Sequence, residues 1–327
     1  MKRREFAQAL TLTLVAAGAA AQQVEIREWP VPWENSRPRD PFADAQGRVW
    51  FVGQVGNYVA YLDPGTGQFK RFEVEEGTNP HNLIVDERGV WYAGNANARI
   101  GLLDPATGKA RTFPMPDPAA RDPHTLVFAQ DGNIWFTVQG GNFIGRLNPR
   151  TSEVSLIPSK TPRSRPYGIN LDRTGRPWVN LFATNKIATI DPNTLEIREY
   201  ELPRPGARTR RIEVTSDQKV WYVDYAEGYL GMLDPATGHV KEWRTPGGAR
   251  SMPYGMEFDH LDRLWFVETG VQPNTFVGFD PKTEQFFSIT PIASGGGAVR
   301  HMMFEPTKRE IWFGTDRGTI GRAVIPR

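Results

Sequence analysis

The sequence contains no cysteine among its 327 residues. This absence excludes disulfide bonds, cysteine-bound zinc, a thiol nucleophile and a lipid anchor attached through cysteine. Several enzyme motifs are missing as well, because no HExxH, CxxC, P-loop, GxGxxG or Gly-x-Ser-x-Gly pattern occurs. We therefore expect no organic cofactor, and the function must be sought in the wider pattern of the chain.

The sequence also has little excess charge of either sign. Lys and Arg number 39 against 37 Asp and Glu, which gives a formal charge of +2. Lys2, Arg3, Arg4 and Glu5 account for that excess, so residues 22–327 carry a formal charge of zero. A neutral domain argues against nucleic acid and against an anionic membrane as its main partner.

The composition favours an all-β globular domain. Hydrophobic residues make up 39% and charged residues 23% of the chain, as is typical of globular proteins. Glycine (32) and proline (27) are abundant beside 10 Trp and 18 Phe. Many turn residues together with many large rings indicate short strands packed around aromatic side chains.

The first 21 residues have the pattern of a signal peptide. A basic start with Arg3-Arg4 and Phe6 precedes a weakly apolar stretch over 9–21, which ends in three alanines. This stretch is too short to span a membrane, so we exclude it from the fold. The paired arginines are similar to a twin-arginine signal, and a general secretory signal is the alternative. We expect export to the periplasm or beyond, and one domain over 22–327.

A tryptophan recurs seven times along the rest of the chain, followed in six cases by an aromatic residue and once by valine. Successive tryptophans of the pairs are 41 to 47 residues apart, which is the period of a four-stranded propeller blade. The pairs are Trp50-Phe51, Trp91-Tyr92, Trp135-Phe136, Trp178-Val179, Trp221-Tyr222, Trp265-Phe266 and Trp312-Phe313.

Turn signals divide each repeat into short strands. Most units carry an Asp-Pro turn such as Asp63-Pro64 or Asp234-Pro235, where Pro presets a turn conformation and Asp can bond the turn backbone. Apolar residues alternate with a period of two, as in Ile100-Gly101-Leu102, which excludes a helical solenoid. The sequence therefore predicts a seven-bladed β-propeller of four-stranded blades.

The last unit lacks an outer strand, and the start of the domain supplies one. Residues 24–30 are similar to the outer strand over 197–203, with acidic residues, an aromatic ring and a final proline in the same order. We expect this N-terminal strand to complete the C-terminal blade and close the ring, which also removes an exposed sheet edge.

The repeat unit resembles the virginiamycin B lyase (streptogramin lyase) family over nearly all of residues 22–327. The stretches that carry the resemblance are Pro166-Tyr167-Gly168-Ile169, Trp135-Phe136-Thr137, Asn142-Phe143-Ile144-Gly145-Arg146-Leu147 and Glu199-Tyr200-Glu201-Leu202-Pro203.

The resemblance implies a Mg²⁺-dependent elimination that opens an ester-closed macrocycle, with a histidine as base. The base position falls on His301, and one metal carboxylate falls on Asp316. The other metal carboxylate falls on Val299, and a second, substrate-contacting histidine falls on Tyr254. Two of the four functional positions therefore differ, and another metal arrangement, another substrate or the absence of catalysis remain open.

A ring of polar residues is expected at the mouth of the central channel. The residue eleven positions before each Trp begins the innermost strand of its blade, and these starts converge on one face. A shorter turn in the second unit brings His81 to this place. The residues at this place are Arg39, His81, His124, Tyr167, Arg210, Tyr254 and His301. We expect them, together with Arg300, to contact the substrate. Capping contacts between blades are the alternative role for the histidines.

Acidic residues follow three of the tryptophans by three or four positions, namely Asp224, Glu268 and Asp316. We expect them beside Tyr254 and His301. A carboxylate next to a histidine supports general-base catalysis near neutral pH. Oxygen ligands such as Asp316 and Glu268 suit Mg²⁺ or Ca²⁺.

Three functions follow from these patterns. The first is an exported, metal-assisted C–O lyase that acts on a cyclic ester or depsipeptide. The second is a non-catalytic periplasmic propeller that binds a small ligand or a protein at the channel mouth. The third is a lactone-hydrolysing propeller related to gluconolactonases, although seven tryptophan units argue against a six-bladed ring. In each case we expect a monomer without membrane insertion.

Overall fold

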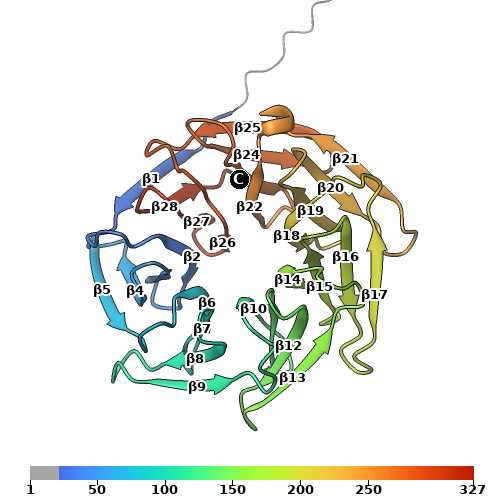
Figure 1. Cartoon of the computed structure of the whole chain (residues 1–327). Helices are drawn as coiled ribbons and strands as arrows, with labels where there is room; N and C mark the ends of the chain where they lie inside the picture. The colour runs from blue at the N-terminus through green and yellow to red at the C-terminus, as the bar shows by residue number, and fades with distance from the viewer. Residues whose placement is uncertain (1–21) are drawn as a thin grey trace, which may run out of the picture.

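The computed structural model describes residues 22–327, and the signal-peptide prediction for 1–21 lies outside this range. Seven four-stranded antiparallel sheets stand around a central axis like the blades of a propeller (Figure 1). Within the described residues the one helical element is the short 3-10 turn η1 (Gly248–Arg250). No helix in this part of the chain has the length and apolar character needed to cross a bilayer. The predicted all-β, seven-bladed fold is confirmed.

The first six blades follow the chain in order, each from its innermost to its outermost strand. Blade 1 contains β2 (Pro38–Ala43), β3 (Val49–Gly53), β4 (Tyr58–Asp63) and β5 (Gln68–Glu73). Blade 2 contains β6 (Pro80–Asp86), β7 (Gly89–Gly94), β8 (Arg99–Leu103) and β9 (Ala110–Pro114). Blade 3 contains β10 (Pro123–Phe128), β11 (Ile134–Val138), β12 (Phe143–Asn148) and β13 (Glu153–Pro158).

The other half of the ring repeats the arrangement. Blade 4 contains β14 (Pro166–Leu171), β15 (Pro177–Leu181), β16 (Lys186–Ile190) and β17 (Ile197–Glu201). Blade 5 contains β18 (Thr209–Val214), β19 (Val220–Asp224), β20 (Tyr229–Leu233) and β21 (Val240–Arg244). Blade 6 contains β22 (Pro253–Phe258), β23 (Leu264–Glu268), β24 (Thr275–Asp280) and β25 (Gln285–Pro291). Blade 7 contains β26 (Met302–Glu305), β27 (Glu310–Gly314), β28 (Thr319–Val324) and β1 (Glu25–Pro30).

The N-terminal strand β1 closes the ring, as the sequence predicts. It pairs antiparallel with β28, with Glu25 opposite Val324 and Pro30 opposite Thr319. Its aromatic residue Trp29 stacks on Trp312 at 5.5 Å between ring centroids, the same spacing at which outer-strand rings stack on the tryptophan in blades 1 and 2. The strand thus takes the place of an outer strand in packing as well as in hydrogen bonding.

The repeated tryptophans occupy the core between blades. Trp50, Trp91 and Trp265 are fully buried. Their indole N–H groups donate to the carboxylate of the preceding turn, as Trp50 does to Asp44 at 2.7 Å, so no donor is left unsatisfied there. The ring that follows each tryptophan covers a glycine of the third strand in several blades. A Cβ atom on Gly145, for example, would lie 2.1 Å from the ring of Phe136.

The beginning of the innermost strand determines what faces the channel. In five blades this strand begins with proline, and the residue before that proline has positive φ. In blades 1 to 6 the pairing with the second strand also shifts near its start. Such a bulge breaks the simple alternation of side chains, so neighbouring residues can face the same space.

Candidate functional site at the channel mouth

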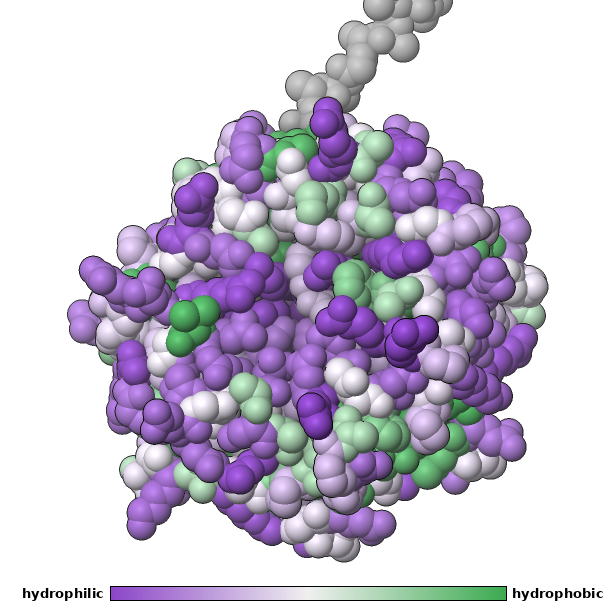
Figure 2. All heavy atoms as spheres, in the orientation of Figure 1, coloured by the Kyte–Doolittle hydropathy of each residue, from purple (hydrophilic) through white to green (hydrophobic). Residues whose placement is uncertain are grey.

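A pocket of about 480 Å³ lies at the channel mouth, where the innermost strands begin. The middle of the ring is hollowed and hydrophilic in the space-filling view (Figure 2). Six of the seven predicted ring positions line this pocket, each as the second residue of its strand. They are Arg39, His81, His124, Tyr167, Arg210 and Tyr254.

Four of these side chains form a continuous stack around the wall. The rings of His81 and His124 are 3.6 Å apart between centroids, and those of His124 and Tyr167 are 4.0 Å apart. The hydroxyls of Tyr167 and Tyr254 are hydrogen-bonded, and Arg210 Nη1 donates to the Tyr254 hydroxyl at 2.9 Å. The wall is therefore held by contacts between residues of five blades.

A second polar layer forms the floor of the pocket. It comes from the residue after the ring position in blades 1, 2, 3 and 5, next to the bulge of each strand. Arg211 reaches across from blade 5, donating to the Arg300 carbonyl at 2.6 Å and to the Thr125 hydroxyl at 3.1 Å. Its guanidinium also lies 3.6 Å from Asp40, which accepts a hydrogen bond from Asn82. These contacts join blades 1, 2, 3, 5 and 7 beneath the mouth.

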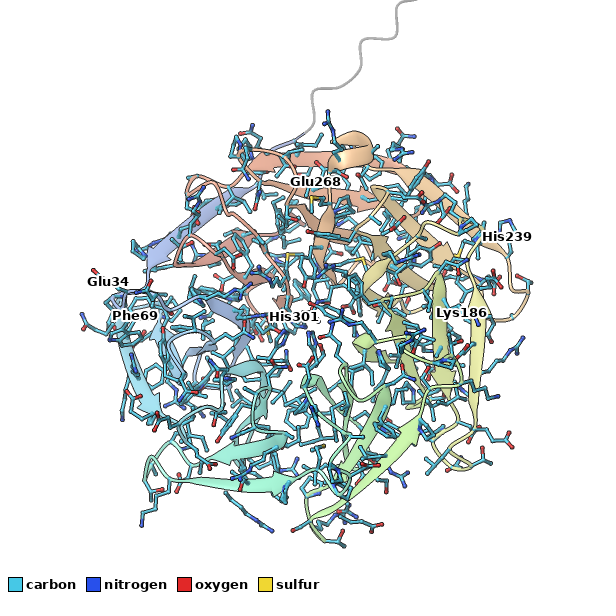
Figure 3. All side chains as sticks on the ribbon, viewed as in Figure 1. Glu34, Phe69, Lys186, His239, Glu268 and His301 are labelled. Carbon is cyan, nitrogen blue, oxygen red and sulfur yellow. The ribbon has the colours of Figure 1, made fainter. Side chains whose placement is uncertain are left out.

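His301 lies close to the ring axis (Figure 3) but differs in setting from the other ring positions. Strand β26 begins at Met302, so His301 precedes its strand rather than standing second in it. The pocket wall here is formed by Ala298 and Arg300, and His301 lies nearer the floor, under the influence of Arg211 and Asp40. Its Nδ1 atom is buried and has no hydrogen-bond partner.

The predicted acidic residues do not gather in one place. Asp224 and Glu268 are the third residue after their tryptophans and Asp316 is the fourth, and neighbouring strand residues point to opposite faces. Asp224 is buried and pairs with Arg204 at 2.7 Å. Glu268 is also buried, accepting hydrogen bonds from Gly247 N at 2.6 Å and from Thr275 at 2.7 Å.

Asp316 stays at the rim of the mouth, in contact with arginines. Arg300 donates to both of its carboxylate oxygens, and Arg37 lies 3.6 Å away. Val299 packs in the hydrophobic core next to this pair. Figure 3 shows Glu268 farther from the axis than His301. Asp316 and Glu268 are thus each engaged by other partners.

This donor set does not fit a hard divalent cation as it is arranged. Among residues 22–327, no three His, Asp or Glu side chains are grouped so that they would hold a metal ion. Asp316 is paired with Arg300, and the position at which the family resemblance implies a second carboxylate holds the buried, apolar Val299. A cation would need Asp316 to leave its arginine first.

Burial and positive charge keep the histidines of the mouth neutral. Burial, then Arg39 and then His124, lower the pKa of His81 well below its usual value. Burial and Arg211 do the same to His124. The pKa of His301 falls to about 4, mainly through burial and Arg211, while Asp40 opposes the shift. All three imidazoles are therefore uncharged at neutral pH.

Three pocket residues were missed in the sequence because they precede the innermost strands. Arg37, Asp122 and Arg165 line the mouth, and each has positive φ just before a proline. Burial raises the pKa of Asp122 to about 7, although Arg165 and Arg39 lower it. The recurring residue before the strand proline was the available signal.

The fourth position after each tryptophan adds further wall residues. Gln54, Asn95 and Gln139 make one side polar and neutral. On the other side, the equivalent residues Phe182 and Tyr225 make the wall aromatic. The sequence pattern pointed to acids at this level, but in blades 4 and 5 the position holds an aromatic ring.

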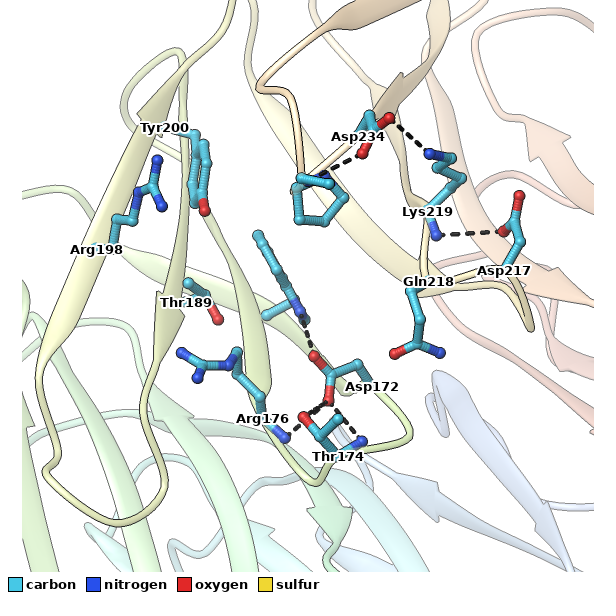
Figure 4. Close-up of a pocket in the computed structure, with 13 residues that line it drawn as sticks. Asp172, Thr174, Arg176, Thr189, Arg198, Tyr200, Asp217, Gln218, Lys219 and Asp234 are labelled. Atoms are coloured by element: carbon cyan, nitrogen blue, oxygen red, sulfur yellow. Dashed lines mark hydrogen bonds and ion pairs between the residues drawn. The ribbon is translucent and has the colours of Figure 1, made fainter.

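A second groove, of about 500 Å³, lies between blades 4 and 5 away from the mouth (Figure 4). Turn residues at the opposite end of the strands line it, among them Asp172, Lys219 and Asp234. Lys219 pairs with Asp234 at 2.6 Å, and Asp172 accepts the indole N–H of Trp178 at 3.1 Å. Several of its charged groups are thus engaged by partners within the protein.

Comparison with protein families gives one match, to the model of the virginiamycin B lyase family over residues 85–324. The chain belongs to this family. The match covers well over half of the chain and includes blades 3 to 6 whole, with the last three strands of the sequence. The resemblance inferred from the repeat is therefore confirmed. A comparison with curated proteins gives no match.

Solved structures show how widely the fold is shared. Virginiamycin B lyase from Staphylococcus aureus is 20% identical, with a TM-score of 0.84 over 93% of this chain and 100% of that one. A streptogramin B lyase is 24% identical, with a TM-score of 0.82 over 91% and 97%. A chain of the mitotic checkpoint complex is 10% identical, with a TM-score of 0.77 over 100% and 99%. At these identities the likeness establishes the fold alone.

Proposed function

We propose that this protein is an exported lyase that breaks a C–O bond in a cyclic ester or depsipeptide bound at the channel mouth. His301 acts as the general base. The observation that carries the proposal is an uncharged imidazole near the axis whose Nδ1 has no partner. No group of the protein engages this nitrogen, so it can take a proton once a substrate reaches it from the mouth.

The reaction would be an elimination next to an ester. His301 takes a proton from the carbon adjacent to the one that bears the ester oxygen. The C–H electron pair becomes a C=C bond, the C–O bond breaks, and the acyl part leaves as a carboxylate. Arg300 and Arg39 line the same mouth, and their charge would stabilise the leaving carboxylate as it forms.

A His301→Ala variant tests the role of the base. Turnover should fall about 10²–10⁴-fold, as is typical when general-base catalysis is lost. The free energy of unfolding should change by under about 1 kcal/mol, because the imidazole is partly exposed and its Nδ1 makes no hydrogen bond. His239→Ala, at an exposed turn, is the matched control and should keep full turnover.

The measurement is a screen of depsipeptide, lactone and ester substrates with purified protein of residues 22–327, with and without Mg²⁺ or Ca²⁺. Full turnover by a well-folded His301→Ala protein would eliminate His301 as the base. No step of this reaction requires a metal, and Asp316 would have to leave Arg300 before it could hold one. Asp316→Asn should then reduce any dependence on added metal.

Fractionation of cells that express the full chain tests export directed by residues 1–21.

A non-catalytic binding protein is the second candidate, and the ion pair at the rim favours it. Arg300 engages both oxygens of Asp316, and Val299 and Tyr254 replace a carboxylate and a histidine that the family resemblance would place there. In this case no substrate of the screen would turn over. A ligand would still raise the melting temperature, because binding to the folded state stabilises it.

A further inference from the structure

The mouth is rich in arginine and poor in acid. Five arginines line the pocket: Arg37, Arg39, Arg165, Arg210 and Arg300. Asp122 is the one acidic residue in the lining, and the histidines beside it are uncharged at neutral pH. Asp316 at the rim and Asp40 in the floor offset part of the positive charge. Positive charge remains in excess at a site closed by the Arg211 layer.

Several donors in this pocket have no acceptor within the protein. Arg39 is 4% exposed, and its Nη2 atom makes no hydrogen bond, although Nη1 donates to Gln54 at 2.7 Å. Nε of Arg210 is likewise buried without a partner. Leaving a buried charged donor unpaired costs free energy. An acceptor brought by a ligand would recover it, and a carboxylate matches the planar fork of arginine.

The side of the same pocket that blades 4 to 6 form is aromatic. The guanidinium of Arg210 lies 4.0 Å from the ring centroid of Tyr225 and 4.2 Å from that of Phe182. Tyr167 and Tyr254 complete this wall. A flat ring would find stacking partners here while a carboxylate attached to it faced the arginines. The two walls together thus favour one kind of ligand.

We propose that the mouth binds an aromatic carboxylate, held by Arg39 and Arg165 at its charged end and by the tyrosines at its ring. This inference rests on the proposed function for the site that it occupies, and it extends that function by naming the substrate class: an ester that carries an aromatic carboxylate. The neutral charge of the whole domain gives no hint of such a site.

Calorimetric titration with benzoate, compared with benzamide, tests the charge directly. The two probes have nearly the same shape, but only benzoate is an anion. We expect benzoate to bind at least about tenfold more tightly, and to lose that advantage as salt is added. Equal affinity for both probes, or no binding of benzoate, would overturn the proposal.

Variants locate the binding within the mouth. Arg165 is exposed and donates no side-chain hydrogen bond within the protein, so Arg165→Gln should leave the fold intact. It should weaken benzoate about threefold to tenfold and leave benzamide unchanged. Arg39→Lys keeps the positive charge beside Asp40 but lacks the planar guanidinium that can bind both oxygens of a carboxylate. It should also lower the affinity for benzoate. Arg198→Gln, in the groove between blades 4 and 5, is the control and should have no effect.

The two proposals fail in different ways. If benzoate binds the wild type and His301→Ala equally while no ester turns over, the lyase proposal fails and the anion site stands. If an ester turns over while benzoate and benzamide bind alike, the anion site fails and the lyase stands. Benzoate binding that Arg165→Gln and Arg39→Lys leave unchanged would also contradict the assignment.

Discussion

The two ends of the central channel treat buried charge in opposite ways. At the mouth, Arg210 and Arg39 hold permanent positive charge close to ligand-accessible space. Glu213 and Glu257 lie three residues after Arg210 and Tyr254, in the innermost strands β18 and β22 of neighbouring blades. Burial, followed by the proximity of Glu257, raises the pKa of Glu213 well above its usual range. Burial raises the pKa of Glu257 to about 7.

The difference arises because a carboxyl group can become neutral by keeping a proton, and an arginine side chain cannot become neutral. A buried carboxyl avoids the cost of desolvation by keeping its proton, whereas arginine cannot lose its proton in a protein. This pair of glutamates therefore carries less than its full negative charge, and Asn170 donates a hydrogen bond to Glu213. The mouth retains charge and must find partners for it, either in Asp40 and Asp316 or in a ligand.

Among the changes considered, replacing Arg211, in the floor of the mouth, should have the largest effect on the free energy of unfolding. Arg211→Met leaves Asp40 fully buried with only Arg39 as a positive partner. Breaking a buried pair in this way costs about 3–5 kcal/mol of unfolding free energy, measurable by urea denaturation. The double variant with Asp40→Asn should recover a large part of that loss. Equal stability of Arg211→Met and the wild type would show that the floor network contributes nothing.

Replacing Glu213 by a neutral residue should have a smaller effect on stability, and this effect should depend on pH. Because the folded-state pKa of Glu213 is raised, its proton stabilises the fold at low pH, and this stability is lost as pH rises through the folded value. Glu213→Gln keeps an acceptor for Asn170 and carries no charge. Its stability relative to the wild type should be similar at pH 5 and higher by at least about 1 kcal/mol at pH 9. A difference independent of pH would contradict the raised pKa.

The smallest effect concerns the one acid that lines the mouth. Asp122 is neutral below its pKa of about 7 and charged above it, facing Asn95, Arg165 and Arg39. Benzoate binding should therefore weaken about threefold to tenfold between pH 6 and pH 8, as negative charge appears beside the ligand. The histidines stay uncharged over this range. Asp122→Asn should bind benzoate equally well at both pH values.

The fold could be predicted from the sequence because its determinants are local and repeated. The tryptophan period, the Asp-Pro turns and the match of residues 24–30 to an outer strand each depend on a short stretch. Even closure of the ring, which joins Trp29 to Trp312, followed from counting strands in the last unit. Features of this kind can be recognised in the amino-acid sequence alone.

The site could be predicted only where a residue keeps a constant distance from the repeated tryptophan. Counting from the tryptophan placed six ring residues in one pocket, but an uncertainty of one position put Glu268 at the mouth rather than between blades. The bulge that brings Arg211 and Asp40 into the floor depends on packing and has no sequence counterpart that we recognised. The pairing of Arg300 with Asp316 likewise depends on side-chain position in space.

Strand β1 has a further consequence for the order of events in folding. The last blade is made of residues from both ends of the chain, and contacts such as that of Ser294 with Glu28 span 266 positions. Blades 1 to 6 can each form from one continuous stretch, but the seventh sheet cannot be complete until the C-terminal residues exist. During synthesis β1 therefore has no partner strand, and the ring stays open, until nearly the whole chain has been made. Contacts between such distant residues also form slowly, so this final pairing should determine how long the unfinished molecule exposes its edges.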